Sequence, residues 1–332
     1  MKTCRSLKLA VAFLLFATCL HGQQPTTDSD FVRGQEALRA RKYQDAISAF
    51  KKAEKQNHGA CSECLLGMAI AYFHLGEKDN ALKNSDKAIA LLTDDAHRAT
   101  AHTLKGQAYL LIEPDSTSLQ KAEAEFREAV KLAPSQADAH LNLACALLKE
   151  SKDDDAVNEL KQCLALNPAP ASADMAKKFL ADPRRGREEL APDFALTTLQ
   201  GQQISLKELA GKTVILDFWA TWCPPCRASV PELKDLTKKY PNDRLVLISI
   251  SGDKDEKAWQ EFVAKHEMNW SQFRDPDHKL GELFRVNGFP TYLVINGDGF
   301  IKARIVGQNP QETIVHHLKD LLASSSELSA KN

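Results

Sequence analysis

The stretch FWATWCPPC at residues 218–226 ends in two cysteines that are separated by two prolines. A Cys-x-x-Cys pair can hold zinc, attach haem, form a structural disulfide or act as a catalytic dithiol. The apolar run TVILDFWA (213–220) is rich in β-branched residues and predicts a strand buried in a sheet. Pro224 and Pro225 suit the first turn of a helix, where backbone N–H groups have no intrahelical acceptor. The sequence therefore predicts a strand, a short loop that ends at Cys223 and a helix that starts at Pro224.

The start of that helix is a favourable place for a thiolate. The free N–H groups and the helix dipole stabilise an anion on Cys223. A thiol with a pKa of about 8.5 is roughly 3% ionised at pH 7, whereas one with a pKa near 7 is about half ionised. Cys226 lies one helical turn further on, where it can attack a mixed disulfide formed by Cys223. No histidine follows Cys226, which argues against haem attachment, and a catalytic dithiol is favoured.

Two residues outside the pair support a catalytic role. Asp217 is the only charged residue of the strand pattern. It predicts a buried acid that exchanges a proton with Cys226, the alternative being an edge-strand carboxylate that faces water. The stretch GFPT (288–291) places Pro290 directly before another strand pattern, a position that accepts a cis X–Pro bond. An ordinary trans proline is the alternative there.

The order of patterns after residue 192 indicates the fold. Strands are predicted at 213–220, 244–251, 291–296 and 300–307, with NGDG (296–299) as a turn. Helices are predicted at 226–240, 256–266 and 311–323. With FWATWCPPC, Asp217, Pro231 and GFPT in this order, residues 192–326 resemble the thioredoxin superfamily. The stretch APDF (191–194), the CPPC pair and a predicted export signal resemble its TlpA/ResA-like branch.

That resemblance implies roles for individual residues. Cys223 would be the attacking thiol, Cys226 the resolving thiol, and Pro290 the cis-proline beside which the substrate backbone docks. Trp222 flanks the pair, and Asp217 takes the place of the buried acid, where many members of the branch carry asparagine.

The branch can also use an acidic residue just after the strand LISIS (247–251). Asp253 stands there and is the predicted supporting residue, with Asp255 and Glu256 as competitors. Trp259, Trp270 and His278 are expected to do no more than pack in the core.

The implied activity is thiol-disulfide exchange with client proteins, in the reductive direction and similar to cytochrome c maturation. It needs no metal and no organic cofactor, and electrons would come from a membrane dithiol donor or a thioredoxin-like partner. One alternative is an interaction scaffold with a redox-sensing domain. Another is a thiol peroxidase, disfavoured because peroxide-reducing relatives usually present a lone cysteine in a Thr-x-x-Cys setting.

The first half of the chain is a helical repeat. Residues 44–55, 79–90, 120–131 and 154–165 superpose directly, and each places small residues seven apart on one helical face. With an upstream helix in each unit, residues 27–181 resemble about four tetratricopeptide repeats, and 171–181 would be the end helix. The fold class is therefore an all-α solenoid followed by an α/β thioredoxin-like domain. The repeats are expected to bind an unknown protein.

Four further cysteines lie in the repeats. Cys61 and Cys64 (CSEC, 61–64) open a helix, and a local disulfide is favoured over zinc with His58, two reduced thiols or a second redox centre. Cys145 and Cys163 occupy small-residue positions, so core packing is expected, although both lie in one helical hairpin and could pair.

Residues 1–22 have the layout of a signal peptide, with Lys2, Arg5 and Lys8 before the apolar run 9–20. The run spans about 18 Å as a helix, too short for a bilayer core of about 30 Å. Export to the periplasm or another extracytoplasmic space is expected, with lipid anchoring as a weaker alternative. Residues 182–191 form the predicted linker. The net charge of −1 gives no indication of a nucleic-acid partner.

Overall fold

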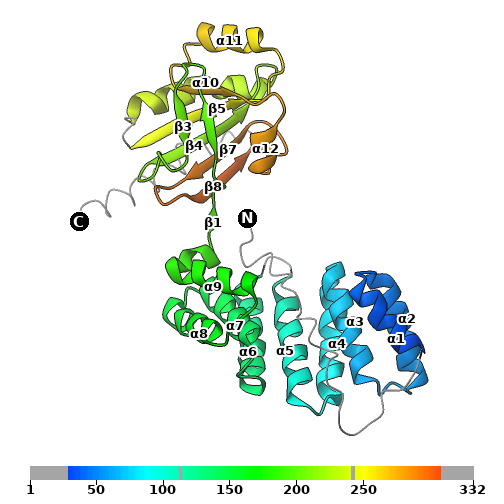
Figure 1. Ribbon diagram of the computed structural model, residues 1–332. Helices are drawn as coiled ribbons and strands as arrows, with labels where there is room; N and C mark the ends of the chain where they lie inside the picture. The colour runs from blue at the N-terminus through cyan, green and yellow to red at the C-terminus, as the bar shows by residue number, and fades with distance from the viewer. Residues whose placement is uncertain (1–28, 112–113, 241–243, 308–332) are drawn as a thin grey trace. The chain divides into compact units, whose positions relative to one another are not determined.

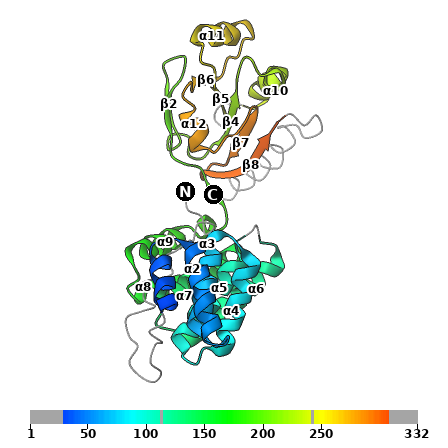
Figure 2. The ribbon, with the colours of Figure 1, turned by 90° about the vertical axis from the view of Figure 1, so that its right-hand side faces the viewer.

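The computed structural model describes residues 29–111, 114–240 and 244–307. The chain divides into two compact units between Arg187 and Glu188 (Figures 1 and 2). The predicted signal segment 1–22 and the predicted last helix 311–323 lie outside the described residues. Within the described parts of the chain, no helix is both long and apolar enough to cross a membrane.

The N-terminal unit consists of helices in which each packs mainly against its neighbours in sequence (Figure 1). The helices pair as α1 with α2, α3 with α4, α5 with α6 and α7 with α8, and α9 closes the stack. Their bounds are α1 Ser29–Arg39, α2 Tyr43–Gln56, α3 Ser62–Leu75, α4 Lys78–Leu91, α5 Asp95–Tyr109, α6 Ser116–Leu132, α7 Ala137–Lys149, α8 Asp153–Ala165 and α9 Pro170–Ala181.

The small residues of the repeat pattern lie where the helices meet. Each is at most 1% exposed, which confirms the predicted close approach: Ala46, Ala53, Ala81, Ala88, Ala122, Ala129, Ala156 and Cys163. In the upstream helices, Gly34 and Gly67 lie against the ring of Phe50, where an added Cβ atom would come within 2.6 and 2.5 Å of ring carbons. The repeat therefore selects small residues because backbones and rings approach closely.

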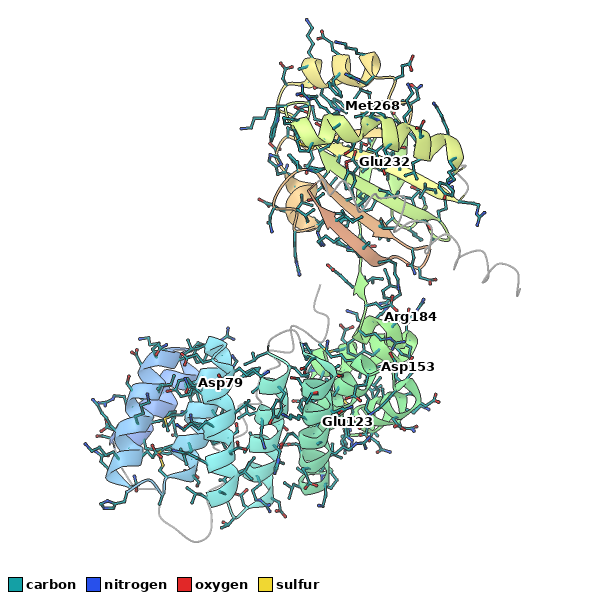
Figure 3. The ribbon with its side chains drawn as sticks, turned by 180° about the vertical axis from the view of Figure 1, so that it is seen from behind. Asp79, Glu123, Asp153, Arg184, Glu232 and Met268 are labelled. Carbon is teal, nitrogen blue, oxygen red and sulfur yellow. A yellow bond between two sulfur atoms is a disulfide. The ribbon has the colours of Figure 1, made fainter. Side chains whose placement is uncertain are left out.

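Ion pairs join the repeats at their edges. Glu123 of α6 (Figure 3) accepts hydrogen bonds from Arg127 at 2.8 Å and from Lys152, in the turn before α8, at 2.6 Å. Burial raises the pKa of the Glu123 carboxyl, but these bonds outweigh it and hold the pKa below its usual value. The pair Glu123–Lys152 thus links the third repeat to the fourth.

The predicted linker, residues 182–191, contains a 3₁₀ turn and the short strand β1. A 3₁₀ turn, Pro183–Gly186, packs on the N-terminal unit, where Gly186 lies against Leu148 and Arg187 forms two hydrogen bonds with Asp153, at 2.6 and 3.0 Å. On the other side, β1 (Glu189–Leu190) pairs with β8 in the sheet of the C-terminal unit.

The C-terminal unit is a mixed sheet with strand order β1-β8-β7-β4-β5-β6, plus a separate β2–β3 hairpin. Strands β4, β5 and β6 are parallel, and β7 runs antiparallel to β4 and β8. The remaining bounds are β2 Ala195–Thr197, β3 Gln203–Ser205, β4 Thr213–Trp219, α10 Pro224–Lys239, β5 Leu245–Ser251, α11 Glu256–Lys265, β6 Ser271–Arg274, α12 Lys279–Leu283, β7 Thr291–Ile295 and β8 Phe300–Val306. Strands β1, β2, β3 and β6 were not predicted.

The central strand β4 is buried along its whole length because both faces of the sheet are covered. Ile215 and Trp219 belong to the apolar cluster formed with α10 and α11. Val214, Leu216 and Phe218 belong to the cluster on the other face, with α12 and the β2–β3 hairpin. Since side chains alternate along a strand, Asp217 points to the same face as Ile215 and Trp219, toward α10.

Candidate active site

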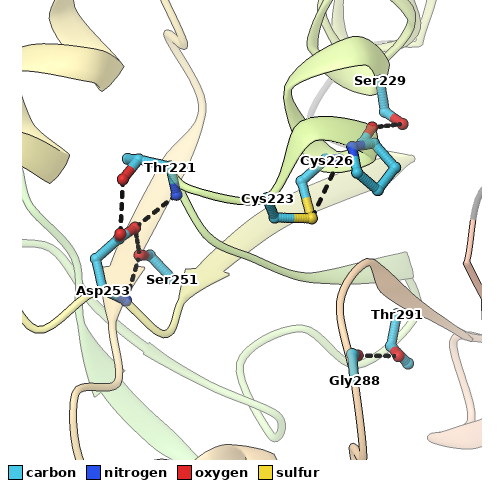
Figure 4. The surroundings of a disulfide bond; sticks show 9 residues. Thr221, Cys223, Cys226, Ser229, Ser251, Asp253, Gly288 and Thr291 are labelled. Carbon is cyan, nitrogen blue, oxygen red and sulfur yellow. Dashed lines mark hydrogen bonds between the residues drawn. A yellow bond between two sulfur atoms is a disulfide. The ribbon is translucent and has the colours of Figure 1, made fainter.

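Strand β4 leads through a short loop to Cys223, which is the N-cap of α10. The structure contains a disulfide between Cys223 and Cys226, with Cα atoms 5.3 Å apart. The backbone N–H of Cys226 donates to the Sγ atom of Cys223 at 3.3 Å (Figure 4). The two prolines occupy the first helical turn, as predicted, and donate no N–H there. The first N–H group available in this turn is therefore that of Cys226, and it donates to the Cys223 sulfur.

The surroundings of the pair are apolar and partly open. Cys223 and Cys226 are 4% and 3% exposed, whereas Trp222 is 65% exposed. The Trp222 ring lies 5.8 Å from that of Phe289, centroid to centroid, and the Phe289–Pro290 peptide bond is cis. Trp222, Phe289 and further residues line an open cavity of about 320 Å³; the others include Phe218, Ile250, Gly252, Asp275 and His278. His278, expected only to pack in the core, thus lies beside the candidate site.

The buried acid sits at the end of a hydrogen-bond chain. Asp217 is 2% exposed, which excludes the water-facing alternative. The Ser249 hydroxyl donates to its Oδ2 atom at 2.6 Å, and Trp270 Nε1–H donates to Ser249 Oγ at 2.8 Å. Burial raises the pKa of Asp217 to about 7, although the Ser249 bond lowers it. A carboxyl with this pKa can both accept and release a proton near neutral pH.

The register of the sheet explains why these residues meet. Ser249 stands opposite Asp217 on β5, and Tyr292 stands opposite it on β7. Tyr292 is buried, and its burial, with the nearby Asp217 charge, holds the pKa of the phenol above its usual value. The sequence interpretation missed Ser249 and gave Trp270 only a packing role. A polar residue within a buried strand, as at Ser249, was the available signal.

The second predicted acid has a different position. Asp253 accepts hydrogen bonds from Thr221 at both the backbone N–H (2.9 Å) and the hydroxyl (2.7 Å), and from the Ser251 hydroxyl at 2.6 Å (Figure 4). Thr221 lies in the loop that leads to the cysteine pair. Of the competitors, Asp255 caps α11 and Glu256 bonds to Arg274. Asp253 is thus the acid that fixes the loop.

The other cysteines have two different environments. Cys61 and Cys64 are joined by a disulfide at the start of α3. Cys145 and Cys163 are buried and are not joined to each other, so the possible pairing is not observed. Burial raises the pKa of the Cys163 thiol to about 11. Among the described residues, no group of three or more His, Cys, Asp or Glu side chains could hold a metal ion.

Comparisons with known proteins assign a different family to each of the two units that meet between Arg187 and Glu188. The AhpC/TSA family matches residues 188–304, and the tetratricopeptide repeat matches residues 31–90 and 115–169. Thiol-disulfide oxidoreductase ResA of Bacillus anthracis is 33% identical over 146 residues, 43% of this chain and 83% of that protein. Thioredoxin-like protein YneN of Bacillus subtilis (strain 168) is 35% identical over 120 residues, 35% of this chain and 69% of that protein.

A solved thiol-disulfide oxidoreductase from Bacteroides fragilis NCTC 9343 aligns with a TM-score of 0.36 and 29% identity, covering 40% of this chain and 99% of that one. The segment matched by the AhpC/TSA family, residues 188–304, includes the strand β4, the cysteine pair and the cis-proline. The chain belongs to the ResA-like thiol-disulfide oxidoreductases of the thioredoxin superfamily, with tetratricopeptide repeats in its N-terminal unit.

Proposed function

We propose that Cys223 is the attacking thiol and Cys226 the resolving thiol of a protein disulfide reductase. The observation that carries the proposal is the position of Cys223 at the start of α10, where the Cys226 N–H donates to its Sγ atom. The same donor and the helix dipole stabilise a Cys223 thiolate once the disulfide is reduced. The oxidised pair in the structure corresponds to the state after a client has been reduced.

The proposed cycle has two exchanges. The Cys223 thiolate attacks one sulfur of a client disulfide, forms a mixed disulfide and releases the other client sulfur as a thiolate. Cys226 then gives its proton to Asp217 and attacks the Sγ atom of Cys223, which releases the second client thiolate. Two electrons pass to the client, and Cys223–Cys226 is left as a disulfide. A membrane dithiol donor or a thioredoxin-like protein restores the dithiol.

Trp222, Pro290 and the repeats would bind the client. The exposed Trp222 ring and the cavity beside Phe289 offer an apolar surface next to the disulfide. An extended client segment would dock along the backbone before β7, at the cis-proline Pro290. The repeats would bind a protein partner and raise its concentration near the dithiol. No metal or organic cofactor takes part in this cycle.

The proposed location is outside the cytoplasm, in the periplasm or an equivalent space, after export by residues 1–22. The expected role there is reductive, similar to cytochrome c maturation. Fusion of residues 1–40 to a reporter that is active only after export tests the location. A reporter signal equal to that of a fusion lacking residues 1–22 would contradict it.

The test of the chemistry is a trap. In the full chain, Cys226→Ser prevents resolution, so client proteins should accumulate as mixed disulfides with Cys223, identified by mass spectrometry. The Cys223→Ser, Cys226→Ser chain is the matched control and should trap nothing. Insulin reduction should fall at least 100-fold in Cys223→Ser; a rate equal to the wild type would instead indicate an interaction protein. Rapid peroxide consumption without trapped clients would indicate a thiol peroxidase.

A further inference from the structure

The Cys61–Cys64 pair reproduces the local geometry of the Cys223–Cys226 pair. Cys61 is the N-cap of α3, and the N–H of Cys64 donates to its Sγ atom at 3.2 Å; the corresponding distance at Cys223 is 3.3 Å. The Cα atoms are 5.2 Å apart in one pair and 5.3 Å in the other. In both pairs the second cysteine is the third residue of its helix. Both first cysteines therefore receive one N–H donor at a helix N-terminus, and Glu63 adds a negative charge to the first turn of α3 where α10 has no acidic residue.

The two sulfurs of the repeat pair differ in access. Cys64 is fully buried in the core cluster of the first two repeats, whereas Cys61 is partly exposed at its edge. Thiol-disulfide exchange needs a thiolate to reach one sulfur while the other leaves. An incoming thiolate can thus reach Cys61, and Cys64 is the leaving sulfur.

The Cys61–Cys64 disulfide contributes little to the stability of the fold. A disulfide restricts the unfolded chain less as the closed loop shortens, and this loop spans only the four residues 61–64. Helix α3 is also held independently, because ten of its residues, Cys64–Phe73, are buried. It ends in a left-handed Gly76 whose N–H caps the helix.

We infer that Cys61–Cys64 is a second thiol-disulfide exchange site, reduced by the Cys223/Cys226 dithiol. This inference rests on the proposed function of that dithiol. The Cys223 thiolate attacks Cys61 Sγ, the Cys61–Cys64 bond breaks, and Cys64 leaves as a thiolate that takes up a proton. The Cys226 thiolate then attacks Cys223 Sγ and releases Cys61. Two electrons move from one pair to the other, with one disulfide formed and one broken.

The experiment follows the two pairs separately in the full chain. Oxidised protein receives one molar equivalent of dithiothreitol, is quenched with acid at intervals, and is labelled with N-ethylmaleimide before peptide mass mapping. Labelling of Cys61 and Cys64 should be at least tenfold faster in the wild type than in Cys223→Ser, Cys226→Ser. In Cys226→Ser, a peptide joined through Cys223 and Cys61 should accumulate, with Cys64 labelled.

Insulin reduction by the same samples separates the two proposals. If the wild type reduces insulin but Cys61 and Cys64 are labelled equally fast with and without Cys223 and Cys226, the second site is refuted and the proposed function stands. If neither insulin reduction nor a Cys223–Cys61 peptide is found, the proposed function itself fails. Matching circular dichroism spectra of the wild type and the double variant establish that both chains are folded.

Discussion

The substitution Asp217→Asn tests the buried acid through the pH dependence of stability. Burial raises the pKa of this carboxyl from 3.8 to about 7 in the folded chain. Between these values the folded state binds more protons than the unfolded state, so stability falls as the pH rises through this window. A shift of roughly three pKa units at about 1.4 kcal/mol each costs about 4 kcal/mol above pH 7. Asparagine keeps the shape and accepts the Ser249 bond without ionising.

We therefore expect Asp217→Asn to be close to the wild type near pH 4 and more stable by about 3–4 kcal/mol at pH 8. Every tryptophan of the chain lies in the C-terminal unit, at 219, 222, 259 and 270, so urea unfolding followed by tryptophan fluorescence reports on that unit. The measurement is made on oxidised protein between pH 4 and 8. A stability difference that stays constant across this range would refute titration of Asp217 near neutral pH.

The same variant should be slow in catalysis despite its stability. Loss of the proton acceptor for Cys226 is expected to lower the rate of insulin reduction by about 10- to 100-fold at pH 7. Alkylation of Cys223 by iodoacetamide in the reduced protein should change less than threefold. Ser249→Ala is the matched variant: loss of its bond to the carboxylate should move the midpoint of the stability–pH profile upward. An unchanged midpoint would remove Ser249 from its positioning role.

Two further substitutions and one labelling experiment probe the loop, the repeats and a buried thiol. Thr221→Val removes a hydroxyl donor to Asp253 and should lower the free energy of unfolding by about 1–2 kcal/mol, measured by urea titration, with slower insulin reduction. Gly67→Ala places a methyl group against the Phe50 ring and should cost about 1–3 kcal/mol, measured by circular dichroism during unfolding. Cys163, whose pKa is raised to about 11, should resist iodoacetamide at pH 8 until urea unfolds the chain; labelling of the native protein would contradict its burial.

The features that could be read from the sequence are those set by local periodicity. The apolar run at residues 213–220 predicted a buried strand around Asp217, and β4 is buried at every position. The paired prolines indicated where α10 begins, and it does begin at Pro224. The seven-residue spacing of small residues predicted helix contacts because one helix presents such residues on a single face.

The features that were missed depend on pairing between distant segments. Strand β1 has only two residues and forms because β8 offers a free edge. Strand β6, SQFR, has no apolar alternation and is held by its parallel partner β5. The Trp270–Ser249–Asp217 chain joins residues 21 and 32 positions apart, and only the register of β4 with β5 brings them together. No local pattern encodes that register.

We assign different roles to the two acids of the site: Asp253 positions the loop, and Asp217 transfers a proton. Both oxygens of Asp253 already accept hydrogen bonds, two from Thr221 and one from Ser251, so this carboxylate serves to hold the loop before Cys223. Asp217 accepts one hydrogen bond from a side chain, that of Ser249, and its own side chain points from β4 toward α10. Burial raises the pKa of the Asp217 carboxyl to about 7, so it takes up a proton near neutral pH. We therefore propose Asp217 as the acid that accepts the Cys226 proton.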